Sequence, residues 1–322
     1  SEIIYNGPYK GKTSFRAVLL AGGYVNLDSA QELRWLTELS AECPDKVLRV
    51  GIRANFNLEQ MCPGETTMGK VSGRFGFCYE TGKLKDAIAQ IRSLPNVRIT
   101  GLHLHSSSKS RSVNIFRSIA KMACRLQQEF SLDLEYVDLG GGYCGGMEGR
   151  PEYPDYFPAI ADELSACFTP ERTRLLVEPG ISLISKCTTF VTKVFDTRDI
   201  KCTRYVMTDG SRFNIDPTMI KSSHLFHLRY DGQAADARRV MDSQIISGFT
   251  CMEVDRLFTH ENMPELMPGD EIVYENVGGY TMSLNPLFIQ YFPAVYVREG
   301  EKLTLVRRKW TPADYVQGSI PE

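Results

Sequence analysis

The stretch LEYVDLGGG, residues 134–142, is an apolar run that ends in an acid and then three consecutive glycines. The apolar run predicts a buried strand, and the glycines predict the point where the chain leaves it. Three glycines in a row cost backbone entropy, so they need a structural reason. A tight turn is one explanation. The other is the close approach of a large anion, because backbone N–H groups bind anions where side chains do not block them.

The sequence around this stretch alternates between apolar runs and helical patterns. Each run has the length of a strand and precedes a segment of helical length, which favours parallel strands joined by helices. Ser29, with Glu32 three residues later, predicts the start of one helix. The six strands expected from this pattern are residues 3–6, 24–29, 46–55, 97–105, 134–142 and 174–179.

The pattern changes after residue 182, where strand-like runs follow one another without helices between them. This change predicts two domains, residues 1–182 and residues 183–322, of which the second is mainly antiparallel β. The strands expected in it are residues 187–198, 203–210, 270–280, 288–299 and 302–308.

Polar residues and glycines stand at the C-terminal ends of four strands of the first domain: Arg53, His105, Gly140 to Gly142, and Glu178. A (β/α)8 barrel keeps its chemistry at these ends. An open Rossmann sheet also binds ligands there, but the glycine run lies late in this domain. The fold class we expect is α/β, a TIM-type barrel with about six of its eight strands in this chain, followed by the β domain.

Composition limits the possible partners. The chain has 322 residues and a net charge of -2, from 37 basic and 39 acidic residues, which suggests neither a nucleic-acid nor a membrane partner. No apolar run approaches the length of a membrane span. The nine cysteines form no CxxC pair, so we expect reduced thiols, a cytoplasmic location and no metal site.

Seven motifs occur in an order that resembles one family across nearly the whole chain. They are IIYNGPYK, NLDSAQEL, GLHLHSSS, VDLGGGY, LVEPG, CMEVD and GGYTMSLNPLF. Each motif alone is weak, but together they resemble the fold-type III pyridoxal-phosphate decarboxylases, which include ornithine, arginine and diaminopimelate decarboxylases. The resemblance implies pyridoxal 5'-phosphate as cofactor, an amino acid as substrate, and a homodimer with shared active sites.

The resemblance also implies roles for single residues. His105 would stack on the cofactor ring, and Glu178 would face its nitrogen and keep it protonated, which makes the ring a better electron sink. Cys251 would act from the neighbouring subunit in reprotonation. The other cofactor-binding residues would be Arg53, Ser108, Gly140, Gly141, Gly142, Gly180 and Tyr280, with the glycine N–H groups on the phosphate. The substrate-binding residues would be Asp216, Glu253, Asp255 and Phe288.

Without the family, most of these residues have simpler explanations. His103 and His105 point to the same side of one strand, which is usually a structural arrangement. A lone cysteine such as Cys251 is usually a small buried apolar residue. Glu178 alone would more often be a surface carboxylate, and the GGYT segment could simply be a turn. The order of the motifs is what favours the functional interpretation.

The sequence departs from the family in three places. Ile181 follows EPG where the family has an arginine that helps to hold the phosphate. Asp216 precedes Pro217 where the diaminopimelate branch has an arginine, and an acid suits a distal amine better than a distal carboxylate. The family's Schiff-base lysine lies upstream of IIYNGPYK, so we expect an N-terminal segment with two strands and that lysine, beyond this chain. Lys10 and Lys12 are in the wrong motif to replace it.

The function predicted is the pyridoxal-phosphate-dependent decarboxylation of an amino acid, one with a distal amine. Two alternatives remain: a non-catalytic homologue that binds or regulates a partner, and an amino-acid racemase. The absent lysine and Ile181 favour the non-catalytic homologue, whereas Cys251, His105 and Glu178 oppose it. The racemase pattern lacks the combination of GGG and CxxxD.

Overall fold

The structure, a computed structural model, describes residues 3–71 and 73–320. The chain divides into two compact units, one that ends at Ser182 and one that starts at Leu183. Each unit has its own hydrophobic core, so each is described separately.

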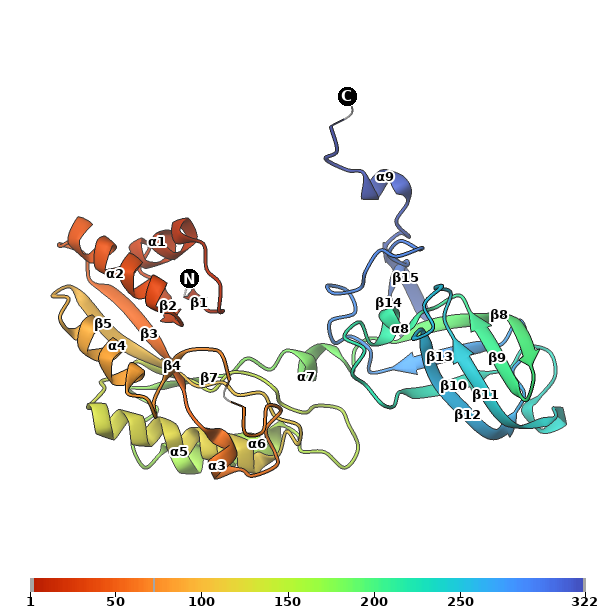
Figure 1. The fold of residues 1–322 in the computed structure, drawn as a ribbon, viewed down its shortest axis with the longest axis horizontal. Coiled ribbons are helices and arrows are strands. Elements are labelled where there is room, and N and C mark those ends of the chain that lie inside the picture. The colour runs from red at the N-terminus through yellow and green to blue at the C-terminus, as the bar shows by residue number, and fades with distance from the viewer. Residues whose placement is uncertain (1–2, 72, 321–322) are drawn as a thin grey trace. The chain divides into compact units, whose positions relative to one another are not determined.

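The first unit is built on a parallel sheet with strand order β1-β2-β3-β5-β6-β7, and β4 pairs with β3 outside this order (Figure 1). Within the described residues, no pairing joins β1 to β7, so the sheet stays open. The strands are β1 Ile4–Tyr5, β2 Tyr24–Leu27, β3 Leu48–Asn55, β4 Phe77–Cys78, β5 Val97–His103, β6 Tyr136–Asp138 and β7 Arg174–Leu176. The helices are α1 Lys12–Leu20, α2 Ala30–Glu42, α3 Leu58–Met61, α4 Lys83–Arg92, α5 Val113–Phe130, α6 Tyr153–Leu164 and α7 Ile181–Ile184.

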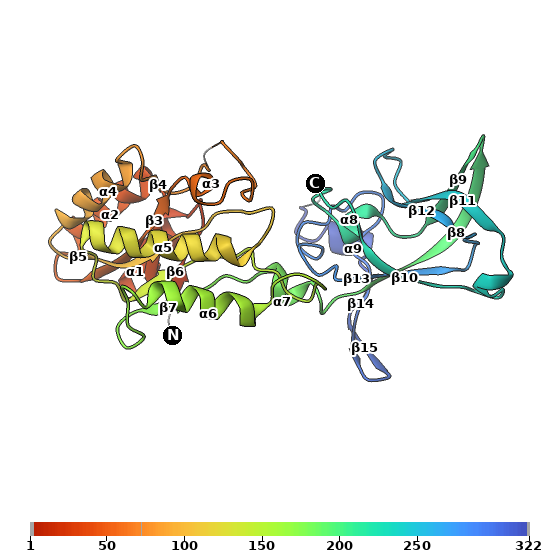
Figure 2. The ribbon, with the colours of Figure 1, turned by 90° about the horizontal axis from the view of Figure 1, so that it is seen from below.

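Helices cover one face of this sheet. Apolar side chains from the strands, such as Val50, Leu102 and Val137, join the helices in one buried core. α5 and α6 pack side by side in both views (Figures 1 and 2). The predicted cap of α2 is present, since the Ser29 hydroxyl accepts a hydrogen bond from the Glu32 backbone N–H.

On the other face of the sheet, the aromatic ring of Tyr136 from β6 lies across the neighbouring strands. The hydroxyl of Tyr136 donates to Asn26 Oδ1 at 2.6 Å, so the side chain reaches across β5 and β3. A Cβ at Gly101 would lie 1.9 Å from the Tyr136 ring, and one at Gly51 would lie 2.3 Å from its hydroxyl. Only glycine leaves room for the ring at these two positions. Residues two positions further along each strand point to the same face, above this ring.

The second unit contains a six-stranded sheet of order β10-β13-β8-β9-β11-β12 and a separate hairpin of β14 and β15 (Figure 2). All pairings are antiparallel except that of β9 with β11. The strands are β8 Phe190–Ile200, β9 Thr203–Thr208, β10 Leu225–Arg229, β11 Val240–Ser247, β12 Arg256–Pro264, β13 Glu271–Glu275, β14 Val295–Glu299 and β15 Lys302–Arg307. Short helical segments are α8 Arg212–Ile215, η1 Ala235–Ala237 and α9 Pro312–Tyr315.

The predicted fold class is confirmed, with differences in detail. All six parallel strands are present, but the strand expected over 134–142 covers only Tyr136–Asp138, because the glycines leave the ladder. The apolar pattern of the sequence does not predict β4, which has two residues, or β10, β11 and β12. The side chains of β10 alternate between exposed and half-buried positions, which weakens the apolar pattern of a strand. No helix in the described part of the chain has the length and apolar composition that a membrane crossing requires.

Candidate active site

Four polar side chains form a row across the C-terminal ends of β2, β3, β5 and β6. Arg53 is in register with His103, and His103 with Asp138, so the three lie on neighbouring strands above the Tyr136 ring. Asp28 follows β2 and pairs with Arg53 through an Nη1–Oδ2 distance of 3.1 Å. All four side chains are buried, so the parallel topology alone brings together residues up to 110 positions apart.

A second layer lies one step further along the strands and contains His105, Gly140, Gly141 and Glu178. The Gly141 N–H donates to His105 Nδ1 at 3.0 Å, and the Glu178 N–H donates to the Gly140 carbonyl at 2.7 Å. A Cβ at Gly140 would lie 2.3 Å from His105 Nδ1, and one at Gly141 would lie 2.1 Å from the Glu178 carbonyl oxygen. Close packing against protein atoms is therefore a sufficient reason for these two glycines.

The third glycine differs from the other two. Gly142 shares a positive φ with Gly140 (+97° and +66°), but a Cβ at Gly142 would meet no atom within 4 Å. The N–H groups of Gly140 and Gly141 are engaged by Asp138 Oδ1 and His105 Nδ1, whereas within the described residues the Gly142 N–H has no acceptor. Among the three amides, that of Gly142 is therefore the one without an acceptor in the described part of the chain.

Burial and charge set the protonation states of the site. Burial, with a further contribution from Arg53, lowers the pKa of His103 to about 2, and the same two causes lower the pKa of His105. Both rings are therefore neutral at physiological pH. Burial first, and then the neighbouring Glu178, raise the pKa of Asp138 to about 7.

Two residues that contact Glu178 were not among the predicted site residues. Asn6, directly after β1, donates through Nδ2 to Glu178 Oε1 and lies 3.5 Å from His103 Nε2. Asp138 has an oxygen within 4.8 Å of both Glu178 and His103. Their sequence signal is a polar residue directly after, or at the end of, a buried strand.

The remaining predicted residues of the first unit, Ser108 and Gly180, lie in the loops that follow β5 and β7. Ser108 is in the loop after β5, where its hydroxyl accepts from the Arg111 N–H at 3.0 Å. Gly180 has a φ of +45° just before α7. Lys10 is buried, and its Nζ lies 3.0 Å from Glu32 Oε1 and 2.6 Å from the Gly7 carbonyl. Lys10 therefore forms a buried structural ion pair with Glu32.

In the second unit, three predicted residues are exposed on loops. Cys251 is exposed and has a free thiol. The side chain of Glu253 is 92% exposed and pairs with Arg256 at 3.0 Å. Tyr280 is half exposed and has a φ of +67°, so its backbone is strained. All three remain available to a ligand or a partner.

Two predicted substrate ligands, Asp255 and Asp216, are instead buried within the second unit. Asp255 accepts hydrogen bonds from the Ser211 hydroxyl, from the Arg212 N–H, and from both the N–H and the hydroxyl of Thr250. The carboxylate thus shapes the loop that carries Cys251. Both oxygens of Asp255 are thus engaged within the second unit.

Asp216 is likewise engaged. It accepts from the guanidinium of Arg212, from the Thr218 hydroxyl and from the Lys221 N–H. Burial alone would raise the pKa of Asp216, but these three hydrogen bonds outweigh it and lower the pKa below its usual value. The structure therefore favours a structural role for both aspartates.

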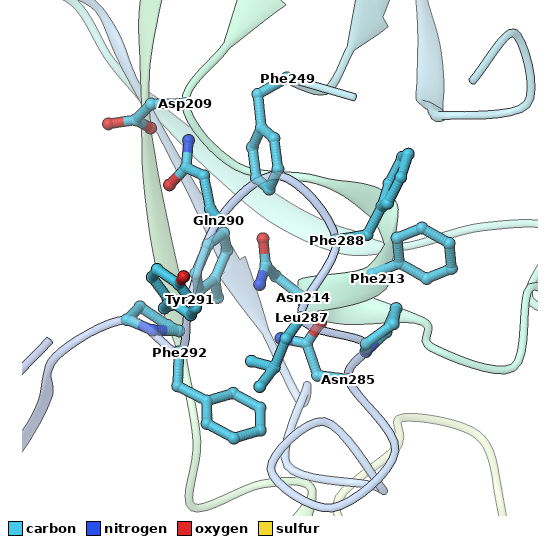
Figure 3. A pocket seen from close by; sticks show the side chains of 13 residues that line it. Asp209, Phe213, Asn214, Phe249, Asn285, Leu287, Phe288, Gln290, Tyr291 and Phe292 are labelled. Carbon is cyan, nitrogen blue, oxygen red and sulfur yellow. The ribbon is translucent and has the colours of Figure 1, made fainter. Parts of the chain in front are cut away.

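Phe288, the fourth predicted substrate ligand, lines a small pocket of about 40 Å³ inside the second unit (Figure 3). Figure 3 shows aromatic rings and amide groups from separate segments converging on it. The labelled neighbours include Phe213, Asn214, Phe249 and Gln290. The pocket has room for a small group only, so it does not by itself accommodate an amino acid.

Residues 1–185 match the family described as pyridoxal-dependent decarboxylase, pyridoxal binding domain. The chain belongs to the pyridoxal-dependent decarboxylases. The predictions of the family, of pyridoxal phosphate as cofactor and of decarboxylation as reaction class are thereby confirmed.

Two curated relatives match nearly the whole chain. The L-glutamyl-[BtrI acyl-carrier protein] decarboxylase of Niallia circulans is 24% identical, and the match covers 98% of this chain and 76% of the relative. The diaminopimelate decarboxylase of Methanocaldococcus jannaschii is 25% identical over 99% of this chain and 74% of the relative.

Solved structures agree on the fold. The crystal structure of diaminopimelate decarboxylase from M. jannaschii in complex with L-lysine has a TM-score of 0.82 and 23% identity, covering 99% of this chain and 74% of that chain. The arginine decarboxylase of Paramecium bursaria Chlorella virus has a TM-score of 0.72 and 19% identity, covering 89% of this chain and 74% of that chain.

The residues at the strand ends fit the cofactor of this family. Gly142 is exposed and has open space on its Cβ side, and the Glu178 side chain is 44% exposed. Two buried atoms of the row below, Arg53 Nε and His103 Nδ1, have no hydrogen-bond partner among the described residues. Buried polar atoms without partners are rare in proteins, so this end of the sheet is suited to a polar ligand.

Proposed function

We propose that this protein decarboxylates an amino acid that carries a distal amine, with pyridoxal phosphate held at the C-terminal strand ends of the first unit. The observation that carries the proposal is the layer formed by His105, the glycine loop and Glu178 above a buried polar row. Family membership supports the reaction class. Relatives named as diaminopimelate and arginine decarboxylases support the distal amine.

Each residue of this layer has a chemical role in the proposal. When bound, pyridoxal phosphate withdraws electrons from the bond that releases CO2. Glu178 holds a proton on the ring nitrogen, because a carboxylate favours the charged form of a base beside it. His105 presents its ring face, fixed by the Gly141 N–H on Nδ1. Gly142 offers its N–H to the phosphate.

The burial of the row below supports the orientation of the cofactor. His103 is neutral, so it does not compete with the ring nitrogen for the negative charge of Glu178. Asn6 fixes one oxygen of Glu178 by a direct hydrogen bond. A carboxylate already held by a hydrogen bond loses less entropy when it binds, which favours a single orientation of the ring.

The buried position of Asp216 bears on which amino acid is the substrate. Its engaged carboxylate cannot serve as the acceptor for a distal amine, so it no longer argues against a distal carboxylate. Diaminopimelate therefore stays among the candidates, together with ornithine, lysine and arginine.

The proposal includes a cytoplasmic homodimer in which Cys251 acts on the site of the neighbouring subunit. The exposed thiol of Cys251 and nine free cysteines support it. Mixing Cys251→Ala subunits with Glu178→Gln subunits should restore part of the activity, since one shared site stays intact. No recovery after verified subunit exchange would contradict a shared site.

The function is tested by measuring CO2 release from single amino acids by the purified protein with pyridoxal phosphate. We expect release from an amino acid with a distal amine and none from leucine. The Glu178→Gln variant should bind the cofactor but release far less CO2. Cofactor binding without CO2 release from any amino acid would favour the non-catalytic alternative.

A further inference from the structure

Asp138 lies between the glycine loop and Glu178. It ends β6, is only 3% exposed, and accepts the Gly140 N–H on Oδ1 at 2.9 Å. Its carboxyl group also lies beside that of Glu178, with an oxygen of each within 4.8 Å of the other. Two carboxyl groups can share a hydrogen bond only if one of them carries a proton. Asp138 is the deeper of the two, because 44% of the Glu178 side chain is exposed.

The groups that face Asp138 do not supply a dedicated counter-charge. His103 on β5 is neutral, and the Arg53 guanidinium on β3 is already paired with Asp28. Glu178, after β7, adds a negative charge, and the buried Tyr136 and Tyr143 add none while protonated. A buried carboxyl with a carboxylate as neighbour favours its neutral form. In agreement, the pKa of Asp138 is raised to about 7.

We propose that Asp138 is a positioning residue that keeps a proton and donates it in a hydrogen bond to Glu178. The oxygen that does not accept from Gly140 carries this proton. Glu178 is then held by two donors, Asn6 and Asp138, and keeps the negative charge of the pair. The same carboxyl group fixes Gly140, so the glycine loop and Glu178 move as one body. The consequence for catalysis rests on the proposed function, whereas the shared proton does not.

The sign of the pH dependence follows from this arrangement. Because the pKa of Asp138 is higher in the folded protein than the usual value near 3.8, the folded state holds a proton that the unfolded state has lost between the two values. Folding stability therefore falls as the pH rises from about 4 to about 7 and stays lower above that range. With an uncharged residue at position 138, this contribution to the loss of folding stability with rising pH is absent.

The test compares melting temperatures of the full chain, without added cofactor, at pH values from 5 to 8. Asp138→Asn keeps an acceptor for Gly140 and a donor for Glu178 but cannot ionise, so we expect it to gain stability relative to the unchanged protein as the pH rises. Glu178→Gln should also weaken the fall, because it removes the facing charge. The control Asp133→Asn changes a 90% exposed side chain just before β6 and should keep the fall of the unchanged protein.

Each outcome decides the proposal. If Asp138→Asn melts with the same pH dependence as the unchanged protein, the shared proton is contradicted. If Asp138→Asn fails to fold, Glu178→Gln decides, since an unchanged fall in that variant also overturns the proposal. A protein that releases no CO2 but shows the predicted melting pattern would contradict the proposed function and leave the shared proton supported.

With cofactor and substrate, the role in catalysis has its own readout. Asp138→Asn should keep its turnover above pH 7, where the unchanged protein loses the proton and its turnover falls. Asp138→Ala should lower kcat more than it changes KM, because Glu178 and the glycine loop are then no longer joined. Equal pH profiles for the unchanged protein and Asp138→Asn would remove the positioning role.

Discussion

The strand ends of the first unit and the loops of the second contrast in how they present their polar residues. In the first unit, parallel register places Asp28, Arg53, His103 and Asp138 in one buried row. In the second unit, Cys251 and Tyr280 are exposed on separate loops. The first unit therefore gathers its polar residues into one cluster by itself, whereas the second leaves Cys251 and Tyr280 exposed and apart.

The two tryptophans allow this contrast to be tested unit by unit. Trp35 lies on α2 of the first unit, where it packs edge-on against Phe15. Trp310 lies in the second unit, where it packs against Phe292. Replacing one tryptophan with phenylalanine leaves the other to report the unfolding of its own unit by fluorescence.

The largest expected effect is on the first unit alone. Lys10→Met leaves Glu32 buried without its partner, which costs about 3–5 kcal/mol. Glu32 also accepts the Asp28 N–H, so the polar row loses support as well. We expect the Trp35 signal to unfold at much lower urea and the Trp310 signal to stay unchanged. Lys10→Met combined with Glu32→Leu should recover part of the loss; no recovery would contradict the assignment of the cost to an unpaired charge.

The next effect is on chemistry at the strand ends. Glu178→Gln replaces a carboxylate with a neutral amide, and the loss of such an electrostatic contact lowers turnover about a hundredfold to a thousandfold. The Trp310 signal should unfold as in the unchanged protein, because Trp310 reports the second unit. Glu171→Gln, an exposed position just before β7, serves as the matched control. Similar rates of CO2 release in both variants would remove Glu178 from the site.

The smallest expected effect is the difference in stability between variants of Asp255 and Glu253, the two acidic residues of the CMEVD motif. Asp255→Ala leaves the buried groups that donate to it without an acceptor, which costs about 2–3 kcal/mol and is reported by Trp310. Glu253→Ala removes an exposed side chain and should change stability by less than about 0.5 kcal/mol. A larger loss of stability for Glu253→Ala than for Asp255→Ala would reverse our assignment of the two residues.

The sequence predicts the architecture well because six buried runs alternate with helical segments, and this pattern has few other solutions. It predicts Glu178 and His105 through motifs. It does not predict that Asn6 bonds Glu178 or that Asp138 lies beside it, because these positions depend on register and on strands far apart in the chain. It also assigns Asp216 and Asp255 to the substrate, since a motif shows which residue is present but not whether its side chain points inward.

The glycine run shows the same limit on a smaller scale. From sequence, all three glycines suggest access for an anion. In the structure, Gly140 and Gly141 make room for His105 and for the backbone of Glu178, and only Gly142 faces open space. Three neighbouring glycines are therefore required for different structural reasons, and these reasons are visible only in the packing around each one.

The most direct test of the central claim is a crystal structure of the protein with bound pyridoxal phosphate. We predict the ring against His105, its nitrogen at hydrogen-bond distance, about 3 Å, from Glu178, and the phosphate at the Gly142 N–H. Asp138 should remain bonded to both Gly140 and Glu178. A cofactor bound elsewhere, or a ring nitrogen that faces no carboxylate, would contradict the account.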